Sequence, residues 1–150
     1  MKISLELFFI LLFVYGCSDP VKIDLKNYSN QIKQISAQEE DALKRWNSVS
    51  GDNFVNDGYM YQALDTYIID NYSQFLEKLN GIKPQTKEIQ ELNNIYIQAA
   101  QKQLNGFKMM RDGLEKHNKD IMKKSYQLLT EGRTEEKNWV KKYEELSKSH

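Results

Sequence analysis

TKEIQELNNIYIQAAQKQLNGFKMMRDGL, residues 86–114, is the stretch that decides the fold. Apolar side chains recur in it at steps of three and four, which is the spacing of one face of an α-helix. These side chains are Ile89, Leu92, Tyr96, Ala99, Ala100, Leu104, Phe107, Met110 and Leu114. No proline occurs between Thr86 and Ser147, so one long helix and two helices that break at 116–119 both fit the pattern. The break is favoured because a soluble helix of the full length needs a partner.

Two further helices are predicted before this stretch. Apolar residues spaced by four and three over residues 21–49 predict the first, which Gly51-Asp52-Asn53 ends. The second is predicted from about Phe54 to Asn80, with Asp52 or Asn53 as its N-terminal cap and Gly81 as its stop. Its predicted apolar face comprises Tyr61, Leu64, Tyr67, Ile68, Tyr72, Phe75, Leu76 and Leu79.

The whole pattern predicts an all-α domain over residues 21–150. The third helix begins near Thr86, and Asn118 is expected to cap a fourth. Four helices of similar length joined by short turns most naturally form an up-down-up-down four-helix bundle.

The first residues of the chain differ from the rest. Lys2 precedes an apolar run over residues 7–15, and Gly16 precedes Cys17, the one cysteine of the chain. A basic start, a short apolar core and a small residue at the boundary are typical of a secretory signal. The run is too short to span a bilayer as a helix, which takes about 20 residues.

Val14-Tyr15-Gly16-Cys17 resembles the lipobox of bacterial lipoproteins. The resemblance implies a lipid on Cys17, removal of residues 1–16, and a mature protein held on the extracytoplasmic side of a cell membrane. Residues 17–20 then form the lipidated cysteine and a short tether. In a Gram-negative host the outer membrane also fits.

The composition argues against several kinds of chemistry. A formal net charge of zero lacks the basic footprint of a nucleic-acid binder. Two histidines and one cysteine cannot build the usual zinc sites, and neither histidine follows a glutamate by three residues, as di-iron bundles require. The chain also lacks a glycine-rich phosphate loop. We therefore expect no cofactor, no metal ion and no enzymatic activity.

Two polar residues interrupt the predicted apolar faces. Glu39 in the first helix and Gln103 in the third stand where the spacing expects an apolar side chain. In a bundle they fall at a similar level, and Tyr67 and Thr130 lie near that level on the other two helices. These four residues form a candidate buried polar layer. It is either a ligand or proton site or a device that fixes helix register, and Glu39 can alternatively rotate to the solvent edge.

The sequence favours a binding role for this domain. Aromatic residues crowd the second helix and are frequent in protein interfaces. We expect a lipid-anchored bundle that acts in protein recognition or scaffolding at the cell envelope, with an envelope protein as its partner. The alternative is a protein that binds a small molecule or lipid in a cavity between its helices.

Overall fold

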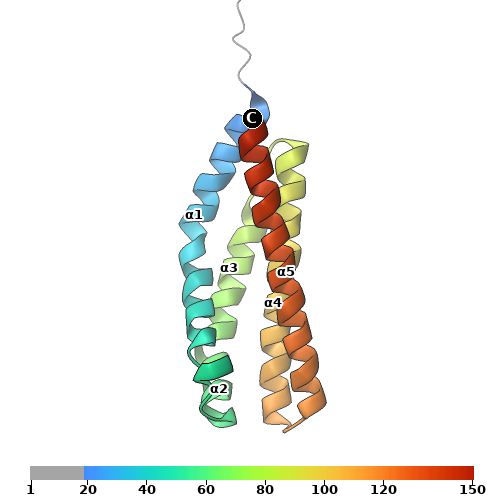
Figure 1. The fold of residues 1–150 in the computed structure, drawn as a ribbon. Helices are drawn as coiled ribbons and strands as arrows, with labels where there is room; N and C mark the ends of the chain where they lie inside the picture. The colour runs from blue at the N-terminus through green and yellow to red at the C-terminus, as the bar shows by residue number, and fades with distance from the viewer. Residues whose placement is uncertain (1–18) are drawn as a thin grey trace, which may run out of the picture.

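The computed structural model describes residues 19–150, and this part is an elongated bundle of helices (Figure 1). Figure 1 shows the chain descending through α1, returning through α2 and α3, descending through α4 and returning through α5. The elements are α1 (Pro20–Asn47), η1 (Gly51–Asn53), α2 (Asp57–Ala63), η2 (Leu64–Ile68), α3 (Ile69–Gly81), α4 (Lys87–Glu115) and α5 (Lys119–Ser149). The predicted all-α four-helix fold is confirmed, because α2, η2 and α3 form one continuous helix.

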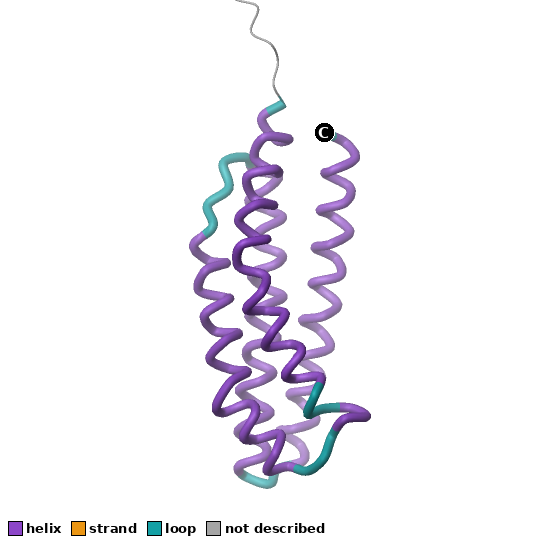
Figure 2. The backbone as a smooth tube through the Cα atoms, turned by 90° about the vertical axis from the view of Figure 1, so that its left-hand side faces the viewer, coloured by secondary structure: helices purple, strands orange, loops and turns teal. Residues whose placement is uncertain are grey.

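Both ends of the described chain lie at the same end of the bundle. Asp19 caps α1 by accepting a hydrogen bond from the backbone N–H of Val21 at 2.9 Å. The other carboxylate oxygen of Asp19 lies 2.7 Å from Nδ1 of His150, and this hydrogen bond lowers the pKa of Asp19. We call this the proximal end, because Cys17 comes two residues before Asp19. The distal end holds the loop between α1 and α2 and the turn between α4 and α5 (Figure 2).

The cap of α2 is Asn56, so the prediction of Asp52 or Asn53 is wrong. The side-chain oxygen of Asn56 accepts a hydrogen bond from the backbone N–H of Tyr59 at 2.9 Å. The short 3-10 turn η1 instead directs Asn53 back to α1, where its side-chain amide donates to the carbonyl of Asn47 at 2.9 Å. Asn53 therefore closes the end of α1 and is not free to start the next helix.

The π turn η2 changes which side chains of the second helix face the core. Met60, Leu64, Ile68 and Tyr72 are all buried at steps of four, whereas a regular helix turns once every 3.6 residues. The wider π turn absorbs the excess rotation. Tyr67 is 40% exposed as a result. Its predicted place on the apolar face is wrong because regular helical spacing does not hold across η2.

Asp24 of α1 fixes the connection between α3 and α4. The second helix ends at Gly81, as predicted. Oδ2 of Asp24 then accepts hydrogen bonds from the backbone N–H groups of Gln85 at 2.8 Å and Thr86 at 2.7 Å, and from the Thr86 hydroxyl. A carboxylate is favourable at the start of a helix, so one helix secures the start of another.

Residues 86–147 form two antiparallel helices, and three glycines bring these helices close together. Asn118 caps α5, as predicted, by accepting hydrogen bonds from the first backbone amides of that helix. A Cβ atom added to Gly106 would lie 2.7 Å from Leu129 Cγ, and one added to Gly132 would lie 2.6 Å from Gln103 Cγ. Gly113 is similarly tight, so α4 and α5 approach more closely than side chains at these positions allow.

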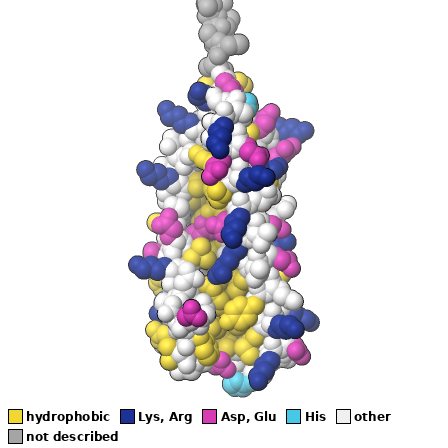
Figure 3. Space-filling model, in the orientation of Figure 1, with side chains coloured by type: hydrophobic (Ala, Val, Ile, Leu, Met, Phe, Trp, Pro, Cys, Tyr) yellow, Lys and Arg dark blue, Asp and Glu magenta, His cyan; other side chains and the backbone are white. Residues whose placement is uncertain are grey.

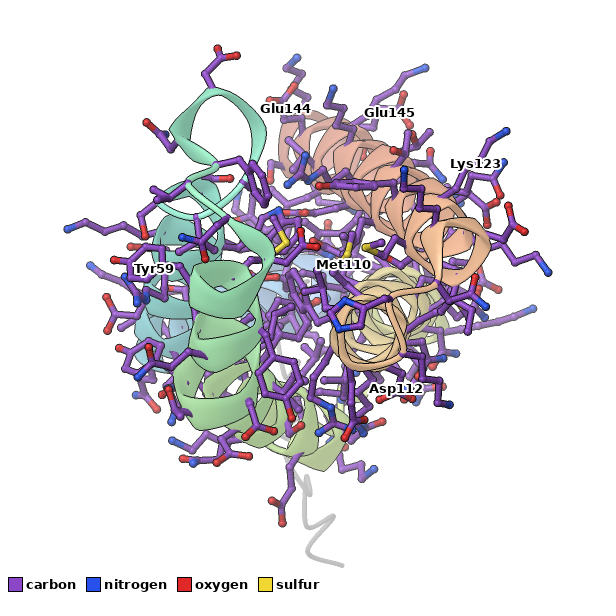
Figure 4. The ribbon with its side chains drawn as sticks, turned by 90° about the horizontal axis from the view of Figure 1, so that it is seen from below. Tyr59, Met110, Asp112, Lys123, Glu144 and Glu145 are labelled. Carbon is purple, nitrogen blue, oxygen red and sulfur yellow. The ribbon has the colours of Figure 1, made fainter. Side chains whose placement is uncertain are left out.

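The core lies between the pair α1–α3 and the pair α4–α5 and is rich in aromatic rings. The Phe107 ring of α4 meets Tyr72 at 5.3 Å and Trp46 at 5.4 Å between ring centroids. Seen from the distal end, Met110 lies between the helices, whereas Tyr59 lies at the periphery (Figure 4). Contacts between α1 and α5 are few by comparison. Within residues 19–150, no helix combines the length and apolar character needed to cross a bilayer.

Candidate functional site

Glu39 is a carboxylate buried in the interior of the bundle, with 5% of its surface exposed. Its Oε1 accepts a hydrogen bond from the hydroxyl of Tyr72 on α3 at 3.1 Å. Its Oε2 accepts one from the hydroxyl of Tyr96 on α4. Both carboxylate oxygens therefore have a donor, and the group links α1 to two other helices.

Burial raises the pKa of Glu39 to about 7 from its usual 4.5. Loss of solvation is the main cause, and the nearby carboxylates of Glu136 and Glu40 raise the pKa further. The two tyrosine hydrogen bonds act in the opposite sense, because they favour the charged form. Burial also raises the pKa of Tyr72 and Tyr96, so both hydroxyls remain donors. Glu39 therefore changes its charge near neutral pH.

Gln103 brings α5 into the same region. Its side chain is 1% exposed, and its Nε2 donates a hydrogen bond to Oε2 of Glu136 at 3.1 Å. Its Oε1 is buried without a hydrogen-bond partner in the described chain. We call Glu39, Tyr72, Tyr96, Gln103 and Glu136 the Glu39 layer, to which all the long helices contribute.

Two of the four predicted layer residues, Glu39 and Gln103, are buried in this layer, and the other two are not. Tyr67 points outward because of η2, as described above. Thr130 is exposed, and its hydroxyl donates to the backbone carbonyl of Tyr126 at 2.8 Å. Thr130 was placed by its level along the bundle alone, whereas its neighbour Leu129 takes the inward position on α5.

Two of the layer residues that were not predicted, Tyr72 and Tyr96, have a signal in the sequence. Tyr72 and Tyr96 both belong to the predicted apolar faces, and a buried tyrosine hydroxyl needs a hydrogen-bond partner. A glutamate on the facing helix is a suitable acceptor for both. Glu136 stands in a run of mixed charges whose ordinary interpretation is a solvated face, so only its contact with Gln103 identifies it.

On the proximal side of the Glu39 layer, hydrogen bonds join α1 to α5. Nε1 of Trp139 donates to the hydroxyl of Tyr28 at 3.1 Å, and the hydroxyls of Ser29 and Tyr143 lie 2.8 Å apart. The Trp139 ring also stacks on Tyr96 of the layer, with 4.2 Å between the ring centroids. We call these two hydrogen bonds the proximal ties.

Toward the distal end, the seam between α1 and α5 opens into a groove of about 340 Å³. Its lining residues, which define the distal groove, are Leu43, Asn47, Gln103, Arg133, Glu136, Lys137 and Val140. Val140 is 42% exposed on its rim. In the described chain, no hydrogen bond or ion pair joins residues 40–47 of α1 to α5. Figure 3 shows apolar surface along this face of the molecule.

Apolar side chains continue from the distal groove to the distal end. Tyr126 of α5 packs on Trp46 with 6.2 Å between ring centroids, yet it remains largely exposed. Phe54 and Val55 are exposed in the loop before α2. Their neighbour Asn53 bonds to Asn47 of the groove, so this loop adjoins the groove.

The two histidines lie at opposite ends of the bundle. His117 lies in the turn between α4 and α5, while His150 lies at the opposite end beside Asp19. Across residues 19–150, no cluster of three or more His, Cys, Asp or Glu side chains is placed to hold a metal ion.

A family model matches the chain over its whole length. The model describes the EMYY-motif containing lipoprotein and covers residues 1–150. The chain belongs to this family. The resemblance to bacterial lipoproteins is therefore confirmed, and this lipoprotein is associated with a membrane through a lipid anchor. The predicted signal peptide and the predicted lipid site at Cys17 lie outside the described residues. Neither a curated protein nor a solved structure matches the chain significantly.

Proposed function

We propose that this lipoprotein recognises or scaffolds a protein partner at the extracytoplasmic face of the bacterial cell envelope. Its anchor is the lipid on Cys17, after removal of residues 1–16. Asp19 follows Cys17 by two residues, so α1 starts next to the bilayer. The role is binding, not catalysis.

The open distal groove is the observation that carries this proposal. The α4–α5 seam is closed by glycines and the proximal ties join α1 to α5, but the distal groove leaves Val140 exposed. Exposed apolar side chains that adjoin one another are typical of interaction surfaces. Leu43 stands 24 residues after Asp19 on α1, and Val140 stands ten residues before His150 on α5. At about 1.5 Å per residue, the groove therefore extends from about 15 Å to about 35 Å from the proximal end. A partner can reach this surface without contacting the bilayer.

The alternative role, binding of a small molecule or lipid between the helices, expects an enclosed cavity. The core positions are instead filled by large side chains such as Trp46, Tyr72 and Phe107, which pack against one another. The distal groove is not enclosed and leaves Val140 exposed, which suits a partner's side chains better than a sequestered ligand.

Photo-crosslinking in living cells tests the proposal. A photoreactive amino acid replaces Val140 in the groove or, as the control, the exposed Asp70 on α3. After irradiation, the captured neighbours are identified by mass spectrometry. We expect a reproducible protein neighbour from position 140 and not from position 70. An absence of neighbours at position 140, or the same neighbours at both positions, would contradict the proposal.

The anchor is tested separately by metabolic labelling with a fatty acid. The full chain should take up the label, and Cys17→Ser should not, because the thioether needs the cysteine sulfur. Labelling that persists in Cys17→Ser would place the anchor elsewhere.

A further inference from the structure

The charges around the distal groove indicate what kind of partner it fits. We propose that the groove binds an acidic amphipathic helix of the partner protein, with an apolar side chain between Leu43 and Val140. This inference rests on the proposed function and adds the chemistry of the partner. It follows from the charge, the shape and the exposed apolar surface of the groove.

Two cations of the groove have no partner in the described chain. Arg133 and Lys137 stand one helical turn apart on α5, and neither forms an ion pair within residues 19–150. Glu136 is the one carboxylate among the lining residues, and it accepts the hydrogen bond of Gln103. The lining therefore carries an excess of positive charge, which complements carboxylates on a bound segment.

Between α4 and α5, by contrast, a cation is paired with carboxylates of the chain itself. Lys102 on α4 pairs with Glu131 at 3.5 Å and also with Glu135. Lys102, which reaches from α4 to α5, is thus paired within the protein, whereas Arg133 and Lys137 of the groove are not. Figure 3 shows basic side chains bordering the apolar surface in the middle of this face.

The shape of the groove suits a helix. Its walls are two long helices that run in opposite directions, α1 and α5 (Figure 1). A third helix can lay its apolar ridge between two such helices, which is a recurring mode of peptide recognition. Carboxylates placed one turn apart on that helix would then reach Arg133 and Lys137 together.

Binding of two synthetic peptides tests this inference. Both form the same amphipathic helix with the same leucines, but the polar face carries glutamates in one and lysines in the other. The full chain is purified in detergent micelles, and binding is followed by fluorescence anisotropy of the labelled peptide. We expect the glutamate peptide to bind at least about tenfold more tightly than the lysine peptide.

Neutralising variants assign this preference to the groove. Arg133→Gln/Lys137→Gln is expected to weaken binding of the glutamate peptide about fivefold to tenfold. Lys119→Gln/Lys123→Gln removes the same charge from exposed positions of the same helix, and Figure 4 shows Lys123 pointing away from the bundle. This control should change the affinity by less than about twofold. Arg133 also influences the Glu39 layer electrostatically, so Lys137→Gln alone serves if the double variant unfolds more easily.

The outcomes separate this inference from the proposed function. Equal binding of the two peptides, or an equal loss in both double variants, overturns the acidic partner. If position 140 still captures a protein in cells, recognition stands and only the partner's chemistry is wrong. If position 140 captures nothing, the recognition role itself fails, whatever the peptides do.

Discussion

The two sides of α5 are built in opposite ways. On the side of α4, Gly106, Gly113 and Gly132 remove side chains so that the two backbones can approach. On the side of α1, the described residues form the proximal ties, the Asp19–His150 hydrogen bond and the aromatic pair of Trp46 and Tyr126. On the α4 side, close packing of the two helices holds α5 in place, because the space at each glycine is too small for a side chain. The second side is left free to bind.

This difference divides the molecule into a rigid hairpin, α4–α5, and a looser seam. The Glu39 layer stands at that seam and links α1 to α3 and α4 by hydrogen bonds. Across to α5, the layer places Glu136 close enough to Glu39 to raise its pKa. The stability of the hairpin therefore depends on close packing, whereas the stability of the seam depends on the charge of Glu39.

The largest effect on stability is expected from placing a side chain in the tight contact between α4 and α5. In Gly132→Val, the new Cβ would lie 2.6 Å from Gln103 Cγ and 3.0 Å from the backbone oxygen of Ala99, and the two methyl groups need still more room. We expect a loss of roughly 2–3 kcal/mol in the free energy of unfolding, because the backbone oxygen of Ala99 can move away only if the helix shifts. Urea unfolding followed by circular dichroism measures it. Gly81→Ala is the control, since a Cβ there meets nothing within 4 Å. Similar losses in both variants would show that the hairpin is not unusually tight.

An effect of similar size is expected from pH at the seam between α1 and α5. The folded pKa of Glu39, about 7, lies above its usual value of 4.5. The folded state thus holds the proton more tightly, and its stabilisation is complete below about 4.5 and lost as the pH rises through 7. We expect Glu39 to make the protein roughly 2–3 kcal/mol less stable at pH 8 than at pH 5.

The variant Glu39→Gln assigns this slope to the layer. A glutamine can accept from one tyrosine and donate to the other, and it carries no charge. The free energy of unfolding, measured with urea between pH 5 and pH 8, should depend much less on pH in this variant. At pH 8 the variant should be more stable than the natural chain. Glu39→Leu should be less stable than Glu39→Gln, because two buried hydroxyls lose their acceptor. An unchanged slope in Glu39→Gln would assign the pH dependence to other groups.

The sequence specified the helices better than it specified the layer. Helical spacing and breakers predicted the four helices, and the cap at Asn118 and the stop at Gly81 are where they were expected. Glu39 and Gln103 stood out because a polar residue on an apolar face is rare and must be explained. Each of these signals is local and lies within about two turns of chain.

The errors come from effects that local spacing does not contain. The π turn η2 interrupts regular helical spacing, and Tyr67 within it is exposed. Local spacing does not single out Asp24, and only the fold brings its carboxylate to the start of α4. The close approach at the glycines of α4 depends on which residues of α5 lie opposite them, and the spacing within α4 does not contain that information.

A still smaller effect is expected from the proximal ties. Tyr143→Phe removes the hydrogen bond with Ser29, which is 2.8 Å long and only partly buried. We expect a loss of about 1 kcal/mol in the free energy of unfolding. Tyr126→Phe is the matched control, because the described chain gives the Tyr126 hydroxyl no hydrogen bond. If the two variants lose equal stability, the hydrogen bond between Tyr143 and Ser29 contributes nothing to the stability of the seam.

The smallest effect on stability is expected in the distal groove. A substitution there should instead affect binding of the partner. Val140→Gln alters a side chain that is already 42% exposed, so unfolding should change by no more than about 0.5 kcal/mol. Ile23→Gln changes a similarly exposed apolar residue near the proximal end, and it should affect the free energy of unfolding just as little. In cells, with the photoreactive amino acid at the neighbouring lining position Leu43, only Val140→Gln should reduce capture of the partner. A residue that matters for capture but not for folding is what an interface requires, whereas a residue of the hairpin should behave in the opposite way. If Val140→Gln instead destabilised the protein as much as Gly132→Val does, the α1 side of α5 would be a second structural seam, and the groove would have to be counted as part of the core.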